Sequence, residues 1–260
     1  EETVVYPVTS PVKMDTVINK EFVSQIRSER NIEIRALEKG FLEKIYVDEG
    51  QHVQAGQVLF RIMPQLYQAD VLKAKAEVAQ AEIELQNAST LAKSNVVSIN
   101  EKRMAKAKLD AAKAELNLAQ THLSFTTIRA PFSGIIDRLP LKLGSLVDEG
   151  DLLTSLSDNG GIFAYFNVSE PEYLNYQTHS AERGNNQVSL IMANGETFPN
   201  KGIIQTIEGE FDNETGNIAF RAKFPNSNQL LRNGETGKIQ MTLPLKNALI
   251  IPQKATYEIQ

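Results

Sequence analysis

The residues that could carry chemistry in this chain are few and scattered. The chain has three histidines, His52, His122 and His179, and it has no cysteine among its 260 residues. The histidines lie far apart and lack the spacing of metal ligands. Without cysteine there is no thiol nucleophile, no Cys zinc site and no disulfide. We therefore expect no catalytic residue, no metal site and no cofactor.

Two kinds of motif deserve comparison with known reactive sites. The stretch Gly234–Lys238 contains a Gly-Lys pair but lacks the spacing of a phosphate-binding P-loop. The acid pairs at 48–49 and 148–149 each precede a glycine, which is typical of solvated turns rather than of acid–base catalysts. No Gly-x-Ser-x-Gly nucleophile elbow is present. These features predict a protein that is not an enzyme.

The composition is that of a globular protein. Hydrophobic residues make up 42% and charged residues 23%, with a net charge of −5. The mild acidity argues against broad nucleic-acid binding, which needs a basic surface. No run approaches about 20 apolar residues, the length that spans a membrane as a helix.

Glycine and proline divide the chain into three parts. No glycine occurs between Gly56 and Gly134, and only Pro64 and Pro131 bracket that stretch. It is rich in Ala, Leu, Lys and Glu, which favours helix. On either side, short β-branched runs alternate with glycines, as in strands and turns. The sequence thus predicts a mainly β fold with a long helical insertion.

The insertion shows two heptad patterns, which predict an antiparallel coiled-coil hairpin. The pattern breaks at 93–97, and Ser98 with Glu101 has the spacing of a capping box at the start of a second helix. Opposite charge excess on the two arms would support the pairing. The seam positions are Val71, Ala74, Val78, Ala81, Leu85, Ala88 and Ala92 on the first arm, and Ala105, Leu109, Ala112, Leu116, Ala119 and Leu123 on the second.

An internal repeat flanks the insertion. Residues 35–62 align without a gap to residues 129–156, at a constant offset of 94 positions. Each copy is too short to bury its own core, so we expect the two copies to pack together. We predict that the turn glycines adopt positive φ angles. They are Gly40, Gly50, Gly56, Gly134, Gly144 and Gly150.

The order of the motifs resembles a known family. The stretches 40–60 and 128–136 resemble the two halves of a biotinyl/lipoyl-type hammerhead, and 166–174 and 211–226 resemble segments of a β-barrel. The stretch 249–255 resembles a return into a membrane-proximal domain. A helical hairpin between two lipoyl halves is similar to the periplasmic adaptors, or membrane fusion proteins, of resistance-nodulation-division (RND) efflux pumps.

The resemblance implies an elongated multidomain adaptor. Its expected parts are a partial membrane-proximal β domain (1–20 and 247–260), a β-barrel (21–31 and 159–246), a lipoyl-like domain (32–63 and 125–158) and an α-helical hairpin (64–124). The membrane-proximal domain is expected to be incomplete here.

The resemblance also implies a function. Such a protein links an inner-membrane RND transporter to an outer-membrane channel protein in a tripartite multidrug efflux pump. Several copies, commonly six, assemble into a sealed duct. We expect a periplasmic location with anchoring to the inner membrane, where adaptors often carry a lipid on an N-terminal cysteine. Because this chain starts at Glu1 and has no cysteine, we expect the anchor to lie outside it.

The hairpin tip is the expected docking site for the channel protein. Apolar residues at the end of a long rod have little of the same chain to pack against. In the family, Leu91 and Ser98 fit a tip pattern, whereas Asn87 stands where an Arg is frequent and Arg103 where an Asp is frequent. Ser98 is equally explained as a helix cap. The candidate docking residues are Asn87, Leu91, Ser94, Val96, Val97, Ser98 and Glu101.

Three other functions compete with this interpretation. An adaptor for an ABC-type exporter or type I secretion system shares the lipoyl-like and hairpin parts, but the barrel motif at 211–226 favours the RND class. A biotinyl or lipoyl carrier would present a modified lysine on the turn between its halves, which the hairpin replaces here. Lys106 follows Met104 and Ala105 inside the expected helix. The third alternative is a structural coiled-coil protein without a transport role.

Overall fold

A computed structural model describes residues 9–94, 96–178 and 186–252. The chain divides into two compact units, one formed by residues 1–29 with 159–260 and the other by residues 30–158. Strand β1 (Val12–Arg35) and strand β8 (Leu152–Ser169) each contribute to both units. The expected membrane-proximal segments fall partly outside the described residues, since 1–8 and 253–260 are not among them.

The unit formed by residues 1–29 and 159–260 is built around a closed sheet. Its strands are paired in the order β1, β12 (Thr236–Ile250), β9 (Gln187–Met192), β10 (Gly202–Ile207), β11 (Asn217–Pro225) and β8. A further pairing of β1 with β8 closes the circle. Alternate residues of β11 are buried, which is the period of two expected of a strand with one face in a core. Six strands therefore form a barrel.

The barrel core is aromatic. Phe166, Phe220 and Phe224 are almost completely buried, and the rings of Phe166 and Phe220 lie 5.6 Å apart. Helix α3 (Glu170–Thr178) follows β8 and places the ring of Tyr176 at 5.1 Å from Phe220, edge to face. Such ring pairs add stability beyond their buried area, so α3 is fixed to the barrel through its aromatic contact.

The unit formed by residues 30–158 contains the repeat and both long helices. One sheet has the order β5 (Thr127–Arg129), β4 (Val58–Ile62), β2 (Gly40–Ile45) and β7 (Leu146–Val147). The short strand β3 (His52–Val53) pairs with β6 (Gly134–Ile136), and β6 pairs with β8. The buried core cluster of this unit includes Val53 and Leu59 and their repeat equivalents, Val147 and Leu153. The two copies thus share one core.

The two copies close each other's turns by reciprocal hydrogen bonds. The amide of Gly50 donates to the Ile136 carbonyl at 2.9 Å, and the equivalent amide of Gly144 donates to the Leu42 carbonyl at 2.9 Å. A second pair of bonds runs from Gly56 to Ala130 at 2.7 Å and from Gly150 to Ala36 at 2.9 Å. Every equivalence is the offset of 94 found in the sequence. The two copies are therefore related by a pseudo-two-fold axis and bind each other through equivalent hydrogen bonds.

Positive φ angles are confirmed at five of the six turn glycines. Gly50, Gly56, Gly144 and Gly150 have φ between 77° and 91°. Gly40 has φ 154° and lies in strand β2. The prediction is wrong for Gly134, which lies in strand β6 and is not among the residues with positive φ.

Gly134 is required for space instead. A Cβ atom there would lie 2.5 Å from the carbonyl oxygen of Ser157 on the paired strand β8. The equivalent glycine, Gly40, would place a Cβ atom 2.7 Å from Ile62. Both glycines thus permit close approach of a neighbouring strand.

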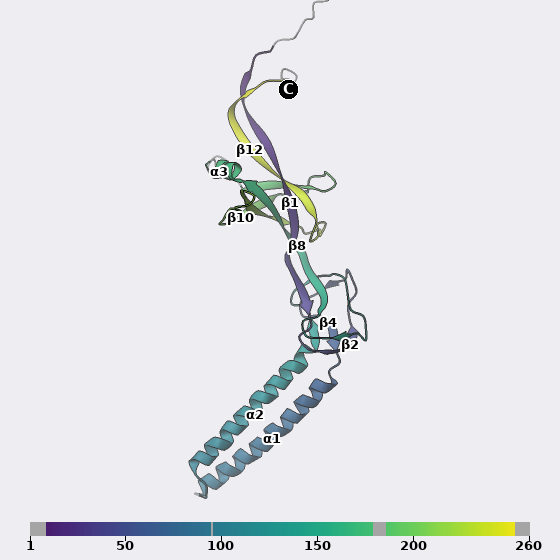
Figure 1. Ribbon diagram of the computed structural model, residues 1–260, viewed down its shortest axis with the longest axis vertical. Coiled ribbons are helices and arrows are strands. Elements are labelled where there is room, and N and C mark those ends of the chain that lie inside the picture. The colour runs from purple at the N-terminus through teal and green to yellow at the C-terminus, as the bar shows by residue number, and fades with distance from the viewer. Residues whose placement is uncertain (1–8, 95, 179–185, 253–260) are drawn as a thin grey trace, which may run out of the picture. The chain divides into compact units, whose positions relative to one another are not determined.

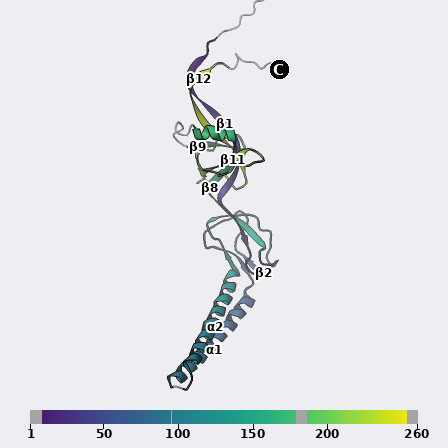
Figure 2. The same ribbon diagram turned by 60° about the vertical axis from the view of Figure 1, so that its left-hand side comes forward.

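The insertion forms two long helices, α1 (Gln65–Lys93) and α2 (Ile99–Phe125). Figures 1 and 2 both show them running side by side from the sheet of this unit. The predicted seam is confirmed: Val71, Ala74, Val78, Ala81 and Leu109 are buried, and the other seam residues are partly buried. Knobs-into-holes packing of a true coiled coil stays a prediction.

Two ion pairs join the helices and show the register in which they lie. Lys108 Nζ lies 2.6 Å from Glu84 Oε2, and Lys113 Nζ lies 3.3 Å from Glu82 Oε1. The hydrogen bond from Lys108 holds the pKa of Glu84 below its usual value. In this register, seam layers of two large residues, such as Val78 with Leu116, alternate with layers of two alanines, such as Ala81 with Ala112. The alanine layers let the helices approach closely.

Gly134 is required for space and Gly144 for its positive φ angle, so asparagine should affect stability differently from alanine at the two positions. Gly134→Ala should destabilise the protein by about 1–3 kcal/mol, because the methyl group meets backbone atoms. Gly144→Ala should cost about 1 kcal/mol, because alanine is strained at positive φ. Asparagine tolerates positive φ better than alanine, so Gly144→Asn should recover stability, whereas Gly134→Asn should be worse than Gly134→Ala.

Urea unfolding followed by circular dichroism measures these differences. Recovery by asparagine at both positions would show that Gly134 is required for its backbone angle and not for space.

Candidate functional site

The residues that could carry chemistry remain apart in the structure. His52 lies in strand β3 and His122 in the last turn of α2, while His179 lies outside the described residues. Nowhere in the described part of the chain do three His, Asp or Glu side chains gather in a way that could hold a metal ion. His122 contacts Glu38 instead, with Nδ1 at 2.5 Å from Oε1. Its role is a contact between α2 and the loop that precedes β2.

The hairpin tip is built by the two helix ends. Helix α1 ends at Lys93 with Ser94 as its C-cap, and Ser94 Oγ donates to the Thr90 carbonyl at 3.3 Å. Ser98 is the N-cap of α2, and its hydroxyl accepts from the Glu101 amide at 3.2 Å. The predicted helix start is thus confirmed. Asn95, between the two caps, lies outside the described residues.

Apolar side chains are exposed at this tip. Leu91 is 42% exposed and Val96 is 67% exposed, and the Val96 amide donates to the Leu91 carbonyl at 2.9 Å. Val97 is partly buried. The structure adds Ile99, which is 68% exposed and which the sequence reasoning did not single out. A β-branched apolar residue directly after the N-cap was the available signal. Leu91, Val96 and Ile99 form what we call the apolar tip.

The remaining candidates are placed around the apolar tip. Ser94, Ser98 and Glu101 are exposed and occupy the two caps and the first turn of α2. Asn87 is exposed on α1, and Arg103 is exposed on α2. Within the described residues, no hydrogen bond or ion pair joins Asn87 to Arg103. The tip therefore offers an apolar surface bordered by polar cap residues, and nothing in its arrangement is that of a reaction centre.

The turn that would carry a lysine in a carrier domain is occupied by the helices. The chain leaves strand β4 at Ile62 and returns at strand β5, with α1 and α2 between them. Lys106 is an exposed residue inside α2. None of the helices in the described residues combines the length and apolar character needed to cross a membrane.

Two family models match the chain, and together they cover most of it. The model described as the barrel-sandwich hybrid domain of RND membrane fusion proteins matches residues 30–158. The model described as the β-barrel domain of RND membrane fusion proteins matches residues 161–245.

The chain is similar in sequence to curated efflux proteins over most of its length. The efflux pump periplasmic linker BepD of Brucella suis biovar 1 is 31% identical over 266 residues, which covers 93% of this chain and 67% of the linker. The multidrug export protein AcrE of Escherichia coli K12 is 30% identical over 270 residues, covering 95% of this chain and 69% of AcrE.

Solved structures share the fold. A MacA–MexA chimeric protein that contains the Pseudomonas aeruginosa MexA α-hairpin domain superposes with a TM-score of 0.76. It is 21% identical and covers 97% of this chain and 92% of its own. Because both halves of the chain match RND models and relatives reach 30% identity over nearly its whole length, this protein belongs to the RND membrane fusion proteins.

Proposed function

We propose that this chain is the periplasmic adaptor of a tripartite RND multidrug efflux pump, linking an inner-membrane transporter to an outer-membrane channel within a sealed duct. The observation that carries the proposal is the helical hairpin, which exposes apolar residues at its tip and along both flanks. The names of the relatives, an efflux pump periplasmic linker and a multidrug export protein, support it. The chain would act through its surfaces and not as an enzyme.

The proposal divides the chain into four parts. These are the partial membrane-proximal domain (1–20 and 247–260), the barrel (21–31 and 159–246), the lipoyl-like domain (32–63 and 125–158) and the hairpin (64–124). The barrel would dock on the transporter and the hairpin on the channel. A periplasmic location and an inner-membrane anchor outside this chain complete the proposal.

A second apolar stripe on α1 supports self-assembly. Five residues two positions before the seam residues repeat at the same heptad spacing and are exposed, which places them on the flank remote from α2. They are Ala69, Leu72, Ala76, Ala79 and Ile83. A helix with apolar stripes on two faces has two packing partners. Here α2 covers only one of the two stripes.

Helix α2 carries the counterpart on the opposite flank. Its second stripe lies two positions after the seam residues and is also exposed. It consists of Ala107, Ala111, Ala114, Leu118 and Phe125, and Met104, seven residues before Ala111, continues it at the heptad spacing. We call these two sets the α1 flank and the α2 flank. Because they differ from one another, a contact between them is heterologous and can close into a ring.

The two flanks complement each other in size. If neighbouring copies stand at the same height, the register of the ion pairs places Ile83 opposite Ala111 and Ala76 opposite Leu118. The same rule places Ala69 opposite Phe125. Large residues then face small ones, which is the arrangement that packs without voids. The α1 flank of one copy and the α2 flank of the next would thus form the wall of the duct.

The alternatives are less well supported. Both matched family models describe RND proteins, which favours this class over an ABC-type exporter or type I secretion adaptor. A purely structural coiled-coil protein would need neither the barrel nor the interlocked repeat.

The carrier alternative is tested by mass. We expect the intact mass of the protein purified from cells to equal the mass of the unmodified chain after any processing. An added biotinyl or lipoyl group on a lysine would revive the carrier function.

Docking at the tip is tested by site-directed cross-linking in cells that produce the transporter and channel. Ser94→Cys and Val97→Cys should each cross-link to the channel protein, because both positions border the apolar tip. Asn117→Cys, exposed in the half of α2 away from the tip, is the matched control. Cross-links from position 117 without any from 94 or 97 would place the channel elsewhere on the hairpin.

Flank packing is tested by a pair of cysteines in one chain. Ile83→Cys with Ala111→Cys should give a ladder of disulfide-linked multimers on oxidation, because the two positions meet only between neighbouring copies. Lys75→Cys with Lys106→Cys, exposed but outside both flanks, should give almost none. The adaptor should remain folded in both variants. Equal yields from the two pairs would contradict packing through the flanks.

A further inference from the structure

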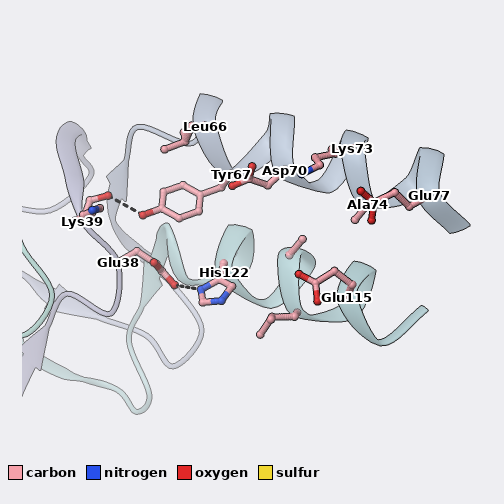
Figure 3. A pocket seen from close by; sticks show the side chains of 12 residues that line it. Glu38, Lys39, Leu66, Tyr67, Asp70, Lys73, Ala74, Glu77, Glu115 and His122 are labelled. Carbon is pink, nitrogen blue, oxygen red and sulfur yellow. Dashed lines mark hydrogen bonds and ion pairs between the residues drawn. The ribbon is translucent and has the colours of Figure 1, made fainter. Parts of the chain in front are cut away.

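A pocket of about 400 Å³ lies at the base of the hairpin, within the unit formed by residues 30–158. Its walls are the first turns of α1, the last turns of α2 and the loop that precedes β2 (Figure 3). Volumes of this order are typical of small-molecule sites. The pocket lies at the other end of the helices from the apolar tip and is not explained by docking there.

The pocket exists because the seam has small side chains at this level of the hairpin. Ala74 and Ala119 both line the pocket, and the register of the ion pairs places them in one layer of the seam. Ala74 is buried, whereas the larger residues Leu66 and Leu118 on the rim remain at least half exposed. An alanine layer thus forms an apolar floor, and two leucines form an apolar rim that nothing in the described residues covers.

An aromatic ring is fixed at the inner end. The Tyr67 hydroxyl donates to the Lys39 carbonyl at 2.8 Å, and Figure 3 shows the ring extending from α1 toward that loop. Burial and the neighbouring Glu38 carboxylate raise the pKa of Tyr67 above its usual value. The phenol therefore keeps its proton, and its ring is held in place by the hydrogen bond. The face of such a ring attracts cations.

The charge of the lining is predominantly negative. Four carboxylates line the pocket, those of Glu38, Asp70, Glu77 and Glu115, against the ammonium groups of Lys39 and Lys73. Glu38 is the least accessible, with 13% of its side chain exposed, and it contacts His122. The other three carboxylates have no ion-pair partner within the described residues, although Lys108 and Lys113 on the same hairpin pair with other acids. The pocket is thus short of positive charge.

We propose that this pocket binds an amphipathic organic cation, that is, an ammonium or phosphonium group carried on an apolar body. An anion would be repelled by the carboxylates, and a hydrated metal ion would leave the alanine floor and the leucine rim without contact. A neutral apolar ligand would leave the carboxylates uncompensated. An apolar cation can contact the alanine floor with its apolar body, lie against the ring of Tyr67 and neutralise the carboxylates at the same time.

Binding would couple three elements that lie far apart in the sequence. The ligand would touch α1, α2 and the loop containing Glu38, so it would order the base on which the hairpin stands. Neither the transporter nor the channel is needed for this contact. The inference therefore goes beyond the proposed pump function and can be tested on the isolated chain.

The probe is tetraphenylphosphonium, with uncharged triphenylphosphine oxide as the comparison compound. Both are titrated into the purified chain by calorimetry at roughly 0.15 M salt, where exposed charges are screened beyond about 8 Å. We expect saturable one-site binding of the cation and at least about tenfold weaker binding of the neutral compound. Glu77→Gln with Glu115→Gln should weaken binding of the cation by about tenfold.

A matched double variant distinguishes the effect of the pocket carboxylates on binding from the effect of the net charge of the hairpin. Glu101→Gln with Asp110→Asn also removes two carboxylates from the hairpin, but neither residue lines the pocket, so binding should change less than about twofold. Leu66→Ser, which changes a rim residue outside both flanks, should weaken binding of both compounds. Circular dichroism checks that every variant keeps its helices.

Absence of saturable binding, equal binding of the neutral compound, or equal losses in the two double variants would each overturn the proposal. Failure of this assay with intact cross-linking at the tip and flanks would leave the pump function standing. The reverse pattern would leave the pocket standing without the pump.

Discussion

The reciprocal hydrogen bonding between the two copies of the repeat is the constraint on which the unit of residues 30–158 depends. Each copy supplies the carbonyl groups that accept from the turn glycines of the other, so these amides are paired only when both copies are folded together. The chain must leave one copy and return to complete the second. The Ile62 amide donates to the Thr126 carbonyl at 2.8 Å, which ties the two ends of the excursion together. A helical hairpin with a fixed base is the consequence.

The hairpin then has to solve a packing problem with few residues. Its seam alternates large and alanine layers, which brings the helices close and buries the central positions. The apolar residues on the flanks and at the tip gain nothing from this seam, and they remain exposed. Exposed apolar stripes at heptad spacing are costly for a lone rod. Contact between neighbouring copies through the flanks, as proposed, would cover them.

The alanine layers of the seam also leave the pocket at the base of the hairpin. An alanine layer allows close approach where the two antiparallel helices lie side by side. It cannot fill the space where the helix ends join a sheet. The pocket between Tyr67, Glu38 and the end of α2 therefore follows from the seam that makes the hairpin possible. Its carboxylates come from three separated segments, which no local pattern connects.

The sequence by itself determined the helices, their seam, the cap at Ser98 and the repeat, because each is a local or strictly periodic pattern that backbone geometry converts directly into structure. It did not determine the role of Gly134, since the clash with Ser157 arises from a strand 23 positions away along the chain. Closure of the barrel by β1 and β8, the contact of His122 with Glu38 and the exposure of Ile99 were likewise decided by tertiary structure. These features depend on which segments meet, and loop closure and side-chain packing settle that only when the whole chain is folded.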